Sequence, residues 1–103
     1  MTHEIKQRVT YSERMVHYQH GWGNGYVGVP QGHPWFELNY MDIEADVHGE
    51  LTYGQLENDG LYWVGFDTAH GWETEENWPK SRVAEETKKL YKQAVDAIKE
   101  KNQ

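Results

Sequence analysis

The tripeptide Asn58-Asp59-Gly60 separates two runs of alternating apolar and polar residues and constrains the fold more than any other part of the chain. The runs cover about residues 45–56 and 61–67. An Asp-Gly step between two such runs is typical of a β-hairpin, because glycine readily adopts the positive φ of a tight turn. Gly49 and Gly54 indicate bulges or close backbone approach in the first strand. The sequence therefore predicts an antiparallel sheet.

A long amphipathic helix is predicted after the hairpin, over about residues 80–101. Trp78-Pro79 indicates its start, because proline is favoured in the first turn of a helix. We expect the helix to pack on one face of a sheet of about three to five strands, which gives a single α+β domain of residues 1–103. The residues with helical spacing on the predicted inner face are Val83, Thr87, Leu90, Tyr91, Ala94, Val95 and Ile98.

The N-terminal half has weaker patterns. Residues 1–20 fit neither strand nor helix periodicity, which indicates a strand or an irregular entry. Residues 21–25 are rich in glycine and predict a loop, and residues 26–29 predict a short strand that ends at Pro30. A second loop is expected over residues 31–34 and a single helical turn over residues 39–44.

The composition limits what so small a chain can do. With 103 residues the protein has a thin core, and its five tryptophans, seven tyrosines and two phenylalanines are expected mainly to fill it. The absence of cysteine excludes disulfides, thiolate catalysis and thiolate metal sites. No apolar run approaches a membrane span, and the first residues do not resemble a signal peptide. We therefore expect a cytoplasmic protein with no membrane partner.

The net charge of −7 is divided unevenly along the chain. Residues 1–79 carry 3 basic and 13 acidic side chains, a net of −10, whereas residues 80–103 carry 7 basic and 4 acidic side chains, a net of +3. Duplex nucleic acid is an unsuitable partner, because binding it requires clustered lysine and arginine. The acidic part is either a solvated surface or an imitation of nucleic acid toward a basic partner.

Two acid-plus-histidine pairs form the best candidate for a functional site. Asp46 and His48 lie in the first run of the hairpin, and Asp67 and His70 lie at or just past the end of the second. Because side chains two apart share one face of a strand, Asp46 and His48 are expected on the same face. With a turn near Asp59, the two pairs are expected to converge at the far end of the hairpin.

Aromatic and histidine side chains from neighbouring loops extend this candidate site. Pro34 biases His33 toward an extended conformation, so its imidazole is expected to stand off a loop. Aromatic rings can stack on a planar ligand, while histidines meet its phosphate or hydroxyl groups. The residues expected to contact a ligand are His33, Trp35, Asp46, His48, Asp67, His70 and Trp72.

The same side chains leave a metal-dependent alternative open. His48, Asp67 and His70 would suffice for Zn²⁺ or Mn²⁺ with an open coordination position. Their spacing matches no established metal motif, so we expect no metal and no other cofactor. Each histidine can instead be hydrogen-bonded to the backbone in a structural role. The chain has no nucleophile elbow and no phosphate-binding loop, so an enzyme without a metal would need acid–base chemistry from a His/Asp pair. We expect binding rather than catalysis and assign no catalytic residue.

Four segments resemble a family of small bacteriophage and prophage proteins, which carry Gly-Tyr-Val, Gly-His-Pro, Val-His-Gly and Gly-Phe-Asp-x-x-His in this order. The resemblance spans roughly residues 21–72 and implies action inside an infected bacterium, but it implies no particular activity. The segments in this chain are Gly25-Tyr26-Val27, Gly32-His33-Pro34, Val47-His48-Gly49 and Gly65-Phe66-Asp67-Thr68-Ala69-His70.

These observations together predict a phage-type accessory protein that binds a small ligand without turnover in the bacterial cytoplasm. A nucleotide signal of host defence is the candidate ligand, because it needs a polar, aromatic pocket and no catalysis. Two alternatives remain: a metal-dependent hydrolase of a nucleotide-like substrate, and an acidic inhibitor that covers a basic surface of a host protein. The thin core is also compatible with a homodimer that has a pocket at its seam.

Overall fold

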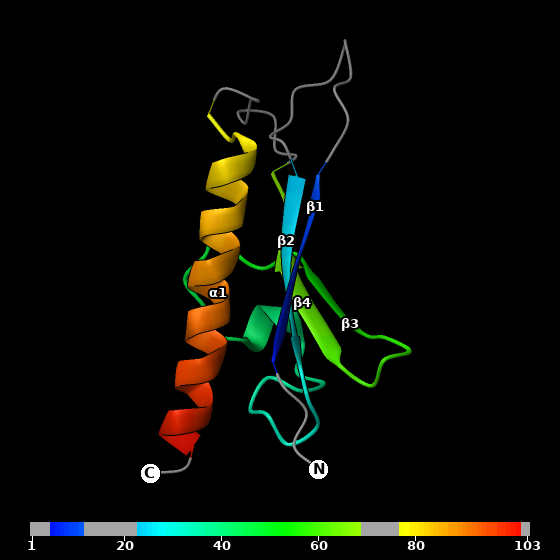
Figure 1. Cartoon of the computed structure of the whole chain (residues 1–103). Coiled ribbons are helices and arrows are strands. Elements are labelled where there is room, and N and C mark those ends of the chain that lie inside the picture. Colours follow the sequence, from blue (N-terminus) through cyan, green and yellow to red (C-terminus); the bar gives the residue numbers. More distant parts are fainter. Residues whose placement is uncertain (1–4, 12–22, 69–76, 102–103) are drawn as a thin grey trace.

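The computed structural model describes residues 5–11, 23–68 and 77–101. Four strands form one antiparallel sheet in the order β1-β2-β4-β3, and helix α1 lies against one of its faces (Figure 1). The predicted α+β fold is confirmed. The elements are β1 (Lys6–Tyr11), β2 (Gly23–Val29), the 3₁₀ turn η1 (Tyr40–Asp42), β3 (Tyr53–Leu56), β4 (Tyr62–Phe66) and α1 (Lys80–Lys101).

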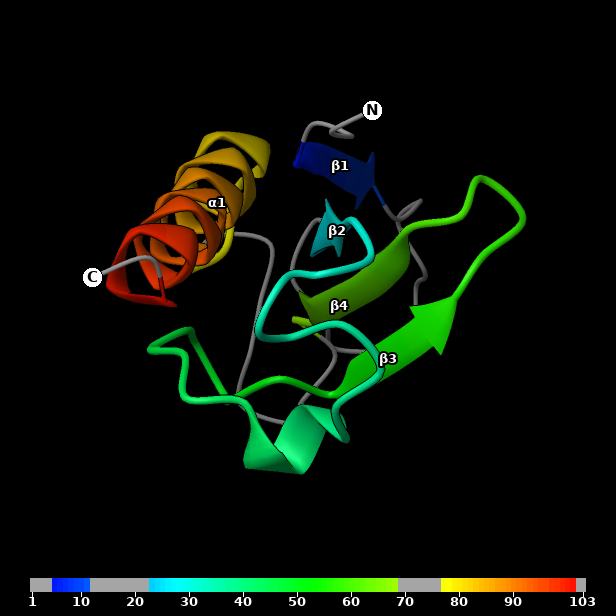
Figure 2. The ribbon, with the colours of Figure 1, turned by 90° about the horizontal axis from the view of Figure 1, so that it is seen from below.

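The strand register assigns alternate side chains to opposite faces of the sheet. Gly25 of β2 is paired with Phe66 of β4, and Val27 with Val64, so these residues share the face that α1 covers. Tyr26 is paired with Gly65 and therefore belongs to the other face. Figure 2 shows α1 on one side of the sheet and the segment between β2 and β3 extending from the sheet toward the helix.

The core lies between α1, the central strands β2 and β4, and the segment that links β2 to β3. Val83, Leu90 and Ala94 of α1 are completely buried. The helix approaches β2 closely at Gly25, where an added Cβ would lie 2.1 Å from the Thr87 hydroxyl oxygen. That hydroxyl donates to the carbonyl oxygen of Val83 at 2.7 Å, so the buried Thr87 does not lack a partner. The predicted helix is confirmed, with Leu90 at the centre of its inner face.

The predicted hairpin is confirmed at its turn. The amide of Glu57 donates to the carbonyl oxygen of Leu61 at 3.0 Å, which leaves residues 58–60 as the loop. Gly60 has φ +83°, the left-handed conformation that glycine adopts without steric cost. The Asp59 carboxylate accepts from the Leu61 amide at 3.0 Å and so stiffens the turn.

The first strand of the hairpin is much shorter than expected. Only Tyr53–Leu56 pairs with β4, and residues 45–52 contain a turn in which the Glu50 amide donates to the carbonyl oxygen of Val47 at 3.2 Å. Gly49 and Glu50 both have φ +65°, which interrupts the strand pleat. The prediction of a strand over residues 45–56 was therefore wrong for its first two-thirds. Asp46 and His48 do not share a strand face.

Other expectations need smaller corrections. Within residues 21–25, predicted as a loop, Gly23, Asn24 and Gly25 belong to β2, and Gly25 serves the close approach of α1. Residues 1–20 contain β1, while residues 1–4 and 12–20 lie outside the described part of the chain. The helical turn at 39–44 is η1, and α1 begins directly after Pro79, as predicted. Ile98 is only half-buried, because it lies near the end of α1.

Leu90→Ala should strongly destabilise the protein, because Leu90 is completely buried between α1 and the sheet. We expect a loss of about 2–5 kcal/mol in the free energy of unfolding, measured by chemical denaturation. Leu56→Ala is the matched control, since Leu56 is 49% exposed, and should change this free energy by less than about 0.5 kcal/mol. Equal losses in the two variants would contradict the described packing of α1.

Candidate functional site

His33 and Trp35 lie in the core rather than on a surface loop. Both side chains are buried, and their rings meet edge to face with centroids 5.2 Å apart. The Trp35 amide donates to Nδ1 of His33 at 2.9 Å, so Nε2 carries the ring proton. Nε2 lies 2.8 Å from the carbonyl oxygen of Ala94 in α1 and donates to it. His33 therefore ties the loop after β2 to the helix.

Asp46 and His48 lie on the loop that links η1 to β3, and this loop is bonded to α1. The side-chain amide of Gln93 holds this loop from both sides of one residue: its oxygen accepts from the Asp46 amide at 2.7 Å, and its nitrogen donates to the Asp46 carbonyl oxygen at 2.9 Å. The His48 amide donates to the Glu86 carboxylate at 2.9 Å. The Asp46 carboxylate lies 3.4 Å from the Lys89 ammonium. These contacts attach the loop to α1 mainly through its backbone.

The ring of His48 packs against the start of α1. Its centroid lies 4.1 Å from that of Trp78, which is buried and also meets Phe66 at 6.4 Å. The guanidinium of Arg82 lies 4.1 Å from the Trp78 ring centroid. His48 and Arg82 thus share one aromatic neighbour, and the guanidinium of Arg82 gives this small aromatic cluster a positive charge.

Asp67 follows β4 directly, but its expected partner His70 lies outside the described residues, as does Trp72. The next residue, Thr68, is buried, and its hydroxyl accepts from the Gly23 amide at 3.3 Å and donates to the Gly23 carbonyl oxygen. The residues that the structure describes contain no group of three or more histidines or acids placed to hold a metal ion. The expected convergence of the two acid-plus-histidine pairs stays a prediction.

A polar and aromatic cluster that the sequence did not indicate covers the sheet face opposite α1. Arg8 of β1 lies across this face, with its guanidinium 4.9 Å from the Tyr26 ring centroid and 4.3 Å from that of Trp63. The guanidinium donates to both carboxylate oxygens of Glu57 at 3.1 and 2.9 Å. The Tyr53 hydroxyl donates to the same carboxylate at 3.2 Å. Arg8 therefore connects one edge of the sheet to the hairpin at the other.

Two glycines allow the aromatic rings to lie flat on this face. A Cβ added at Gly28 would lie 2.7 Å from the Trp63 ring, and one added at Gly65 would lie 2.4 Å from the Tyr26 ring. Each ring thus covers the glycine of the neighbouring strand and supports the guanidinium of Arg8. In the sequence, this cluster could be recognised from an aromatic residue and a glycine at paired positions of neighbouring strands. Such a pair can be identified only when the strand register is known.

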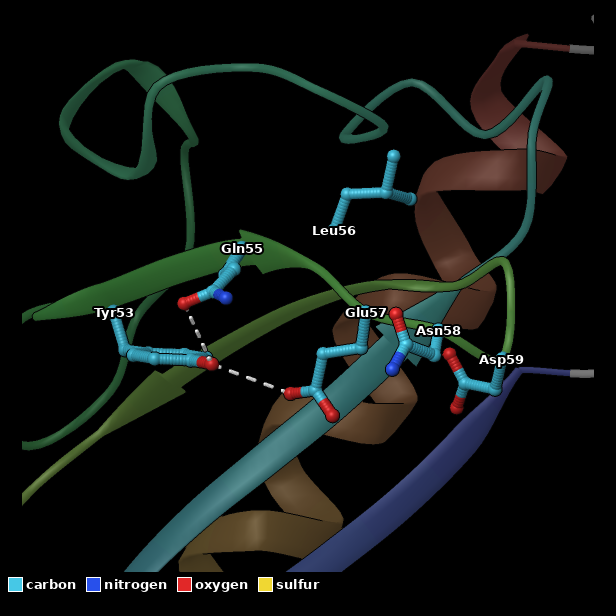
Figure 3. Close-up of a pocket in the computed structure, with 6 residues that line it drawn as sticks. All are labelled: Tyr53, Gln55, Leu56, Glu57, Asn58 and Asp59. Carbon is cyan, nitrogen blue, oxygen red and sulfur yellow. Dashed lines mark hydrogen bonds between the residues drawn. The ribbon is translucent and has the colours of Figure 1, made fainter.

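A shallow depression of about 410 Å³ opens beside this cluster at the hairpin (Figure 3). Figure 3 shows the Tyr53 hydroxyl between Gln55 and Glu57, with Leu56 on the opposite side of the strand. Asp59 accepts from the Trp63 indole nitrogen at 3.0 Å. The carboxylates of this depression are thus engaged by neighbouring donors. Its lining residues are Tyr53, Gln55, Leu56, Glu57, Asn58 and Asp59.

A second pocket, of about 340 Å³, lies along the segment that links η1 to β3. We call residues 37–50 the acidic segment, because its carboxylates are all exposed and it contains no lysine or arginine. A composition count over the whole chain conceals this local concentration. The pocket is lined by Tyr40, Met41, Ile43, Glu44, Ala45, Glu50 and Leu51. The carboxylates of the segment belong to Glu37, Asp42, Glu44, Asp46 and Glu50.

Comparison with family models, curated proteins and solved structures finds no significant match for this chain. The resemblance to small phage proteins therefore stays a prediction. Among the described residues, no helix combines the length and the apolar composition that a membrane span needs. A proposal about function therefore depends on the positions and charges of the described side chains.

The Arg8–Glu57 ion pair should make stability depend on pH. The hydrogen bonds from Arg8 hold the pKa of Glu57 below its ordinary value of 4.5. Because this pKa is lowered, the ion pair contributes fully to the free energy of unfolding above about pH 4.5. The contribution is lost as the pH falls through the pKa of Glu57 in the folded state. We expect Glu57→Gln to flatten the decline of unfolding free energy between neutral and acid pH, measured by urea denaturation.

Glu44→Gln is the control for the removal of one charge, because Glu44 forms no ion pair with any described residue. The control should retain the decline seen in the unmodified protein. The same decline in the Glu57→Gln variant would show that the ion pair does not contribute to the pH dependence.

His33→Ala and His48→Ala should differ in stability. The imidazole of His33 makes two buried hydrogen bonds, so its removal leaves the Trp35 amide without its acceptor and should cost about 1–3 kcal/mol. The hydrogen bond of His48 to Glu86 uses the backbone amide and survives the substitution, so we expect a loss below about 1 kcal/mol. Chemical denaturation of both variants measures the difference. Similar losses would contradict the structural role given to His33.

Proposed function

We propose that this protein is a non-catalytic binding protein that covers a basic surface of another protein. The observation that supports the proposal is the acidic segment, which combines exposed carboxylates with exposed apolar side chains. Leu38 is 39% exposed and Met41 is 74% exposed, and both lie among these carboxylates. Methionine adapts its shape to different partners and is enriched at protein interfaces.

The distribution of charge supports a basic partner. Between Arg14 and Lys80 the chain contains no lysine and no arginine, so every charged side chain in the described residues 23–68 is a carboxylate. Such a one-sided surface repels anions and attracts a cationic surface over several ångströms, which accelerates association. The concentration of carboxylates also makes the complex sensitive to salt, because exposed charges are screened.

The resemblance to phage proteins extends the proposal to the source of the partner. A small phage protein of this kind would act in the cytoplasm of the infected bacterium, so the partner would be a host protein with a basic surface. Binding alone blocks such a surface, and no reaction is required. The proposal therefore retains binding without turnover and changes the site from the acid-plus-histidine pairs to the acidic segment.

A small nucleotide ligand is a second candidate, and the cluster at the start of α1 favours it. The guanidinium of Arg82 lies over the Trp78 ring beside the imidazole of His48, and a guanidinium suits phosphate. If this candidate is correct, native mass spectrometry of protein purified from bacteria should detect a bound small molecule, and Arg82→Ala should release it. A protein without bound mass before and after infection would argue against this candidate.

The main proposal can be tested by photo-crosslinking in bacterial cells. A photoreactive phenylalanine analogue at Met41 should crosslink to a protein, because this side chain is the most exposed apolar group of the acidic segment. The same analogue at Gln7, which is exposed on β1 at the other edge of the sheet from β3, is the control and should not give this product.

The crosslinked protein, identified by mass spectrometry, should have a basic surface, and its complex should weaken steeply between low and physiological salt. The same product from both positions, or a complex indifferent to salt, would contradict the proposal.

A further inference from the structure

The pocket along the acidic segment has the form expected for a cationic side chain of the partner. We propose that it receives one lysine or arginine side chain, with the alkyl stem on its apolar floor and the charged end at its carboxylate rim. This inference rests on the proposed function and specifies how the partner is recognised. Lysine and arginine side chains have in common an alkyl chain that ends in a cation.

The lining of the pocket is mainly polar, and its smaller apolar part forms the floor. Ile43 and Leu51 are 8% and 7% exposed, and Ala45 beside them is half-buried. Met41 extends from the lining into solvent. The pocket volume of about 340 Å³ is at the small end of the range for ligand sites, which suits a single side chain better than a whole nucleotide. A lysine or arginine stem can cover such a floor while its charged end stays near water.

The rim of the pocket supplies the complementary charge. Glu44 and Glu50 both line it, and both are exposed. Across residues 5–11, 23–68 and 77–101, neither carboxylate forms a salt bridge or a side-chain hydrogen bond. Two carboxylates at the same pocket favour a cation there and repel a phosphate or carboxylate ligand. An uncharged apolar ligand would use the floor but leave the rim without a partner.

The depression at the hairpin does not offer the same site. Its carboxylate Glu57 is already bound by the guanidinium of Arg8, and Asp59 accepts from the backbone and from Trp63. The chain thus places its own arginine where an external cation would bind. At the hairpin a ligand would have to displace Arg8, whereas at the acidic segment the carboxylates of the rim are accessible.

Small alkyl cations can test this pocket directly by NMR of the complete ¹⁵N-labelled protein. We expect n-butylammonium and n-butylguanidinium to shift the amide signals of Met41, Ala45 and Leu51, with a dissociation constant on the order of 1 mM. Tetramethylammonium lacks the alkyl chain and n-butanol lacks the charge, so both should bind about tenfold more weakly or not at all. Tighter binding of the ammonium would indicate lysine in the partner, and tighter binding of the guanidinium would indicate arginine.

A matched pair of double variants separates the rim from the general charge. Glu44→Gln with Glu50→Gln removes both rim carboxylates and should weaken n-butylammonium binding on the order of tenfold. Glu37→Gln with Asp42→Asn removes the same charge from the acidic segment but not from the pocket lining, and should change binding by less than about twofold. Residue 50 has a φ of +65°. Glutamine has nearly the same shape as glutamate, so the substitution should not alter the energetic cost of this backbone conformation.

Three results would overturn the inference: amide shifts that map outside the pocket, equal binding of n-butanol, or unchanged binding in the rim variant. Failure of this inference is distinguishable from failure of the proposed function. A crosslink at Met41 that survives loss of n-butylammonium binding would leave the protein partner in place and reject only the inserted side chain. Binding of n-butylammonium without any crosslink would reject the protein partner.

Discussion

Helix α1 packs closely against β1 and β2 on one face of the sheet, and much of the described structure depends on how closely it approaches β2. Gly25 lets α1 approach β2 until the Thr87 hydroxyl occupies the space of a missing side chain. Val83 and Leu90 can then be fully buried against the strands. In a chain with so little core, this contact joins α1 to a cluster that also includes Trp35, Ile43 and Leu51 of the segment between β2 and β3. The described segment between β2 and β3 attaches both to α1 and to the same sheet face, where the Tyr62 hydroxyl donates to the Leu38 carbonyl oxygen.

Two kinds of contact explain the polar side chains of the protein. The loops between β2 and β3 attach to α1, where His33 bonds to a helix carbonyl and Gln93 pairs with the backbone of Asp46. The uncovered face is instead closed by its own side chains, with Arg8 lying over aromatic rings and bound to Glu57. Groups that resemble functional residues in the sequence therefore contribute to the stability of the fold.

Local patterns predicted the elements and failed at the longer-range contacts. The turn at Asp59 and the helix after Pro79 could be read because their signals lie within a few residues. The sequence did not reveal that residues 45–52 form a loop instead of a strand. This loop is held by side chains of α1, about forty residues later in the chain, and contains Glu50 at positive φ. The candidate site depended on the predicted strand. Arg8 and Glu57 are 49 residues apart, so no spacing rule connects them.

The carboxylates divide into those with a structural partner and those without one among the described residues. Glu57 is bound by Arg8, and Glu86 accepts from the backbone of the loop, so both are explained by the fold. Glu44 and Glu50 form no salt bridge or side-chain hydrogen bond with a described residue, and both line one pocket in a segment without lysine or arginine. Carboxylates at the rim of a pocket are well suited to a complex, in which a cation of the partner supplies the complementary charge. The carboxylates that the fold does not use are thus the ones that best define a binding surface.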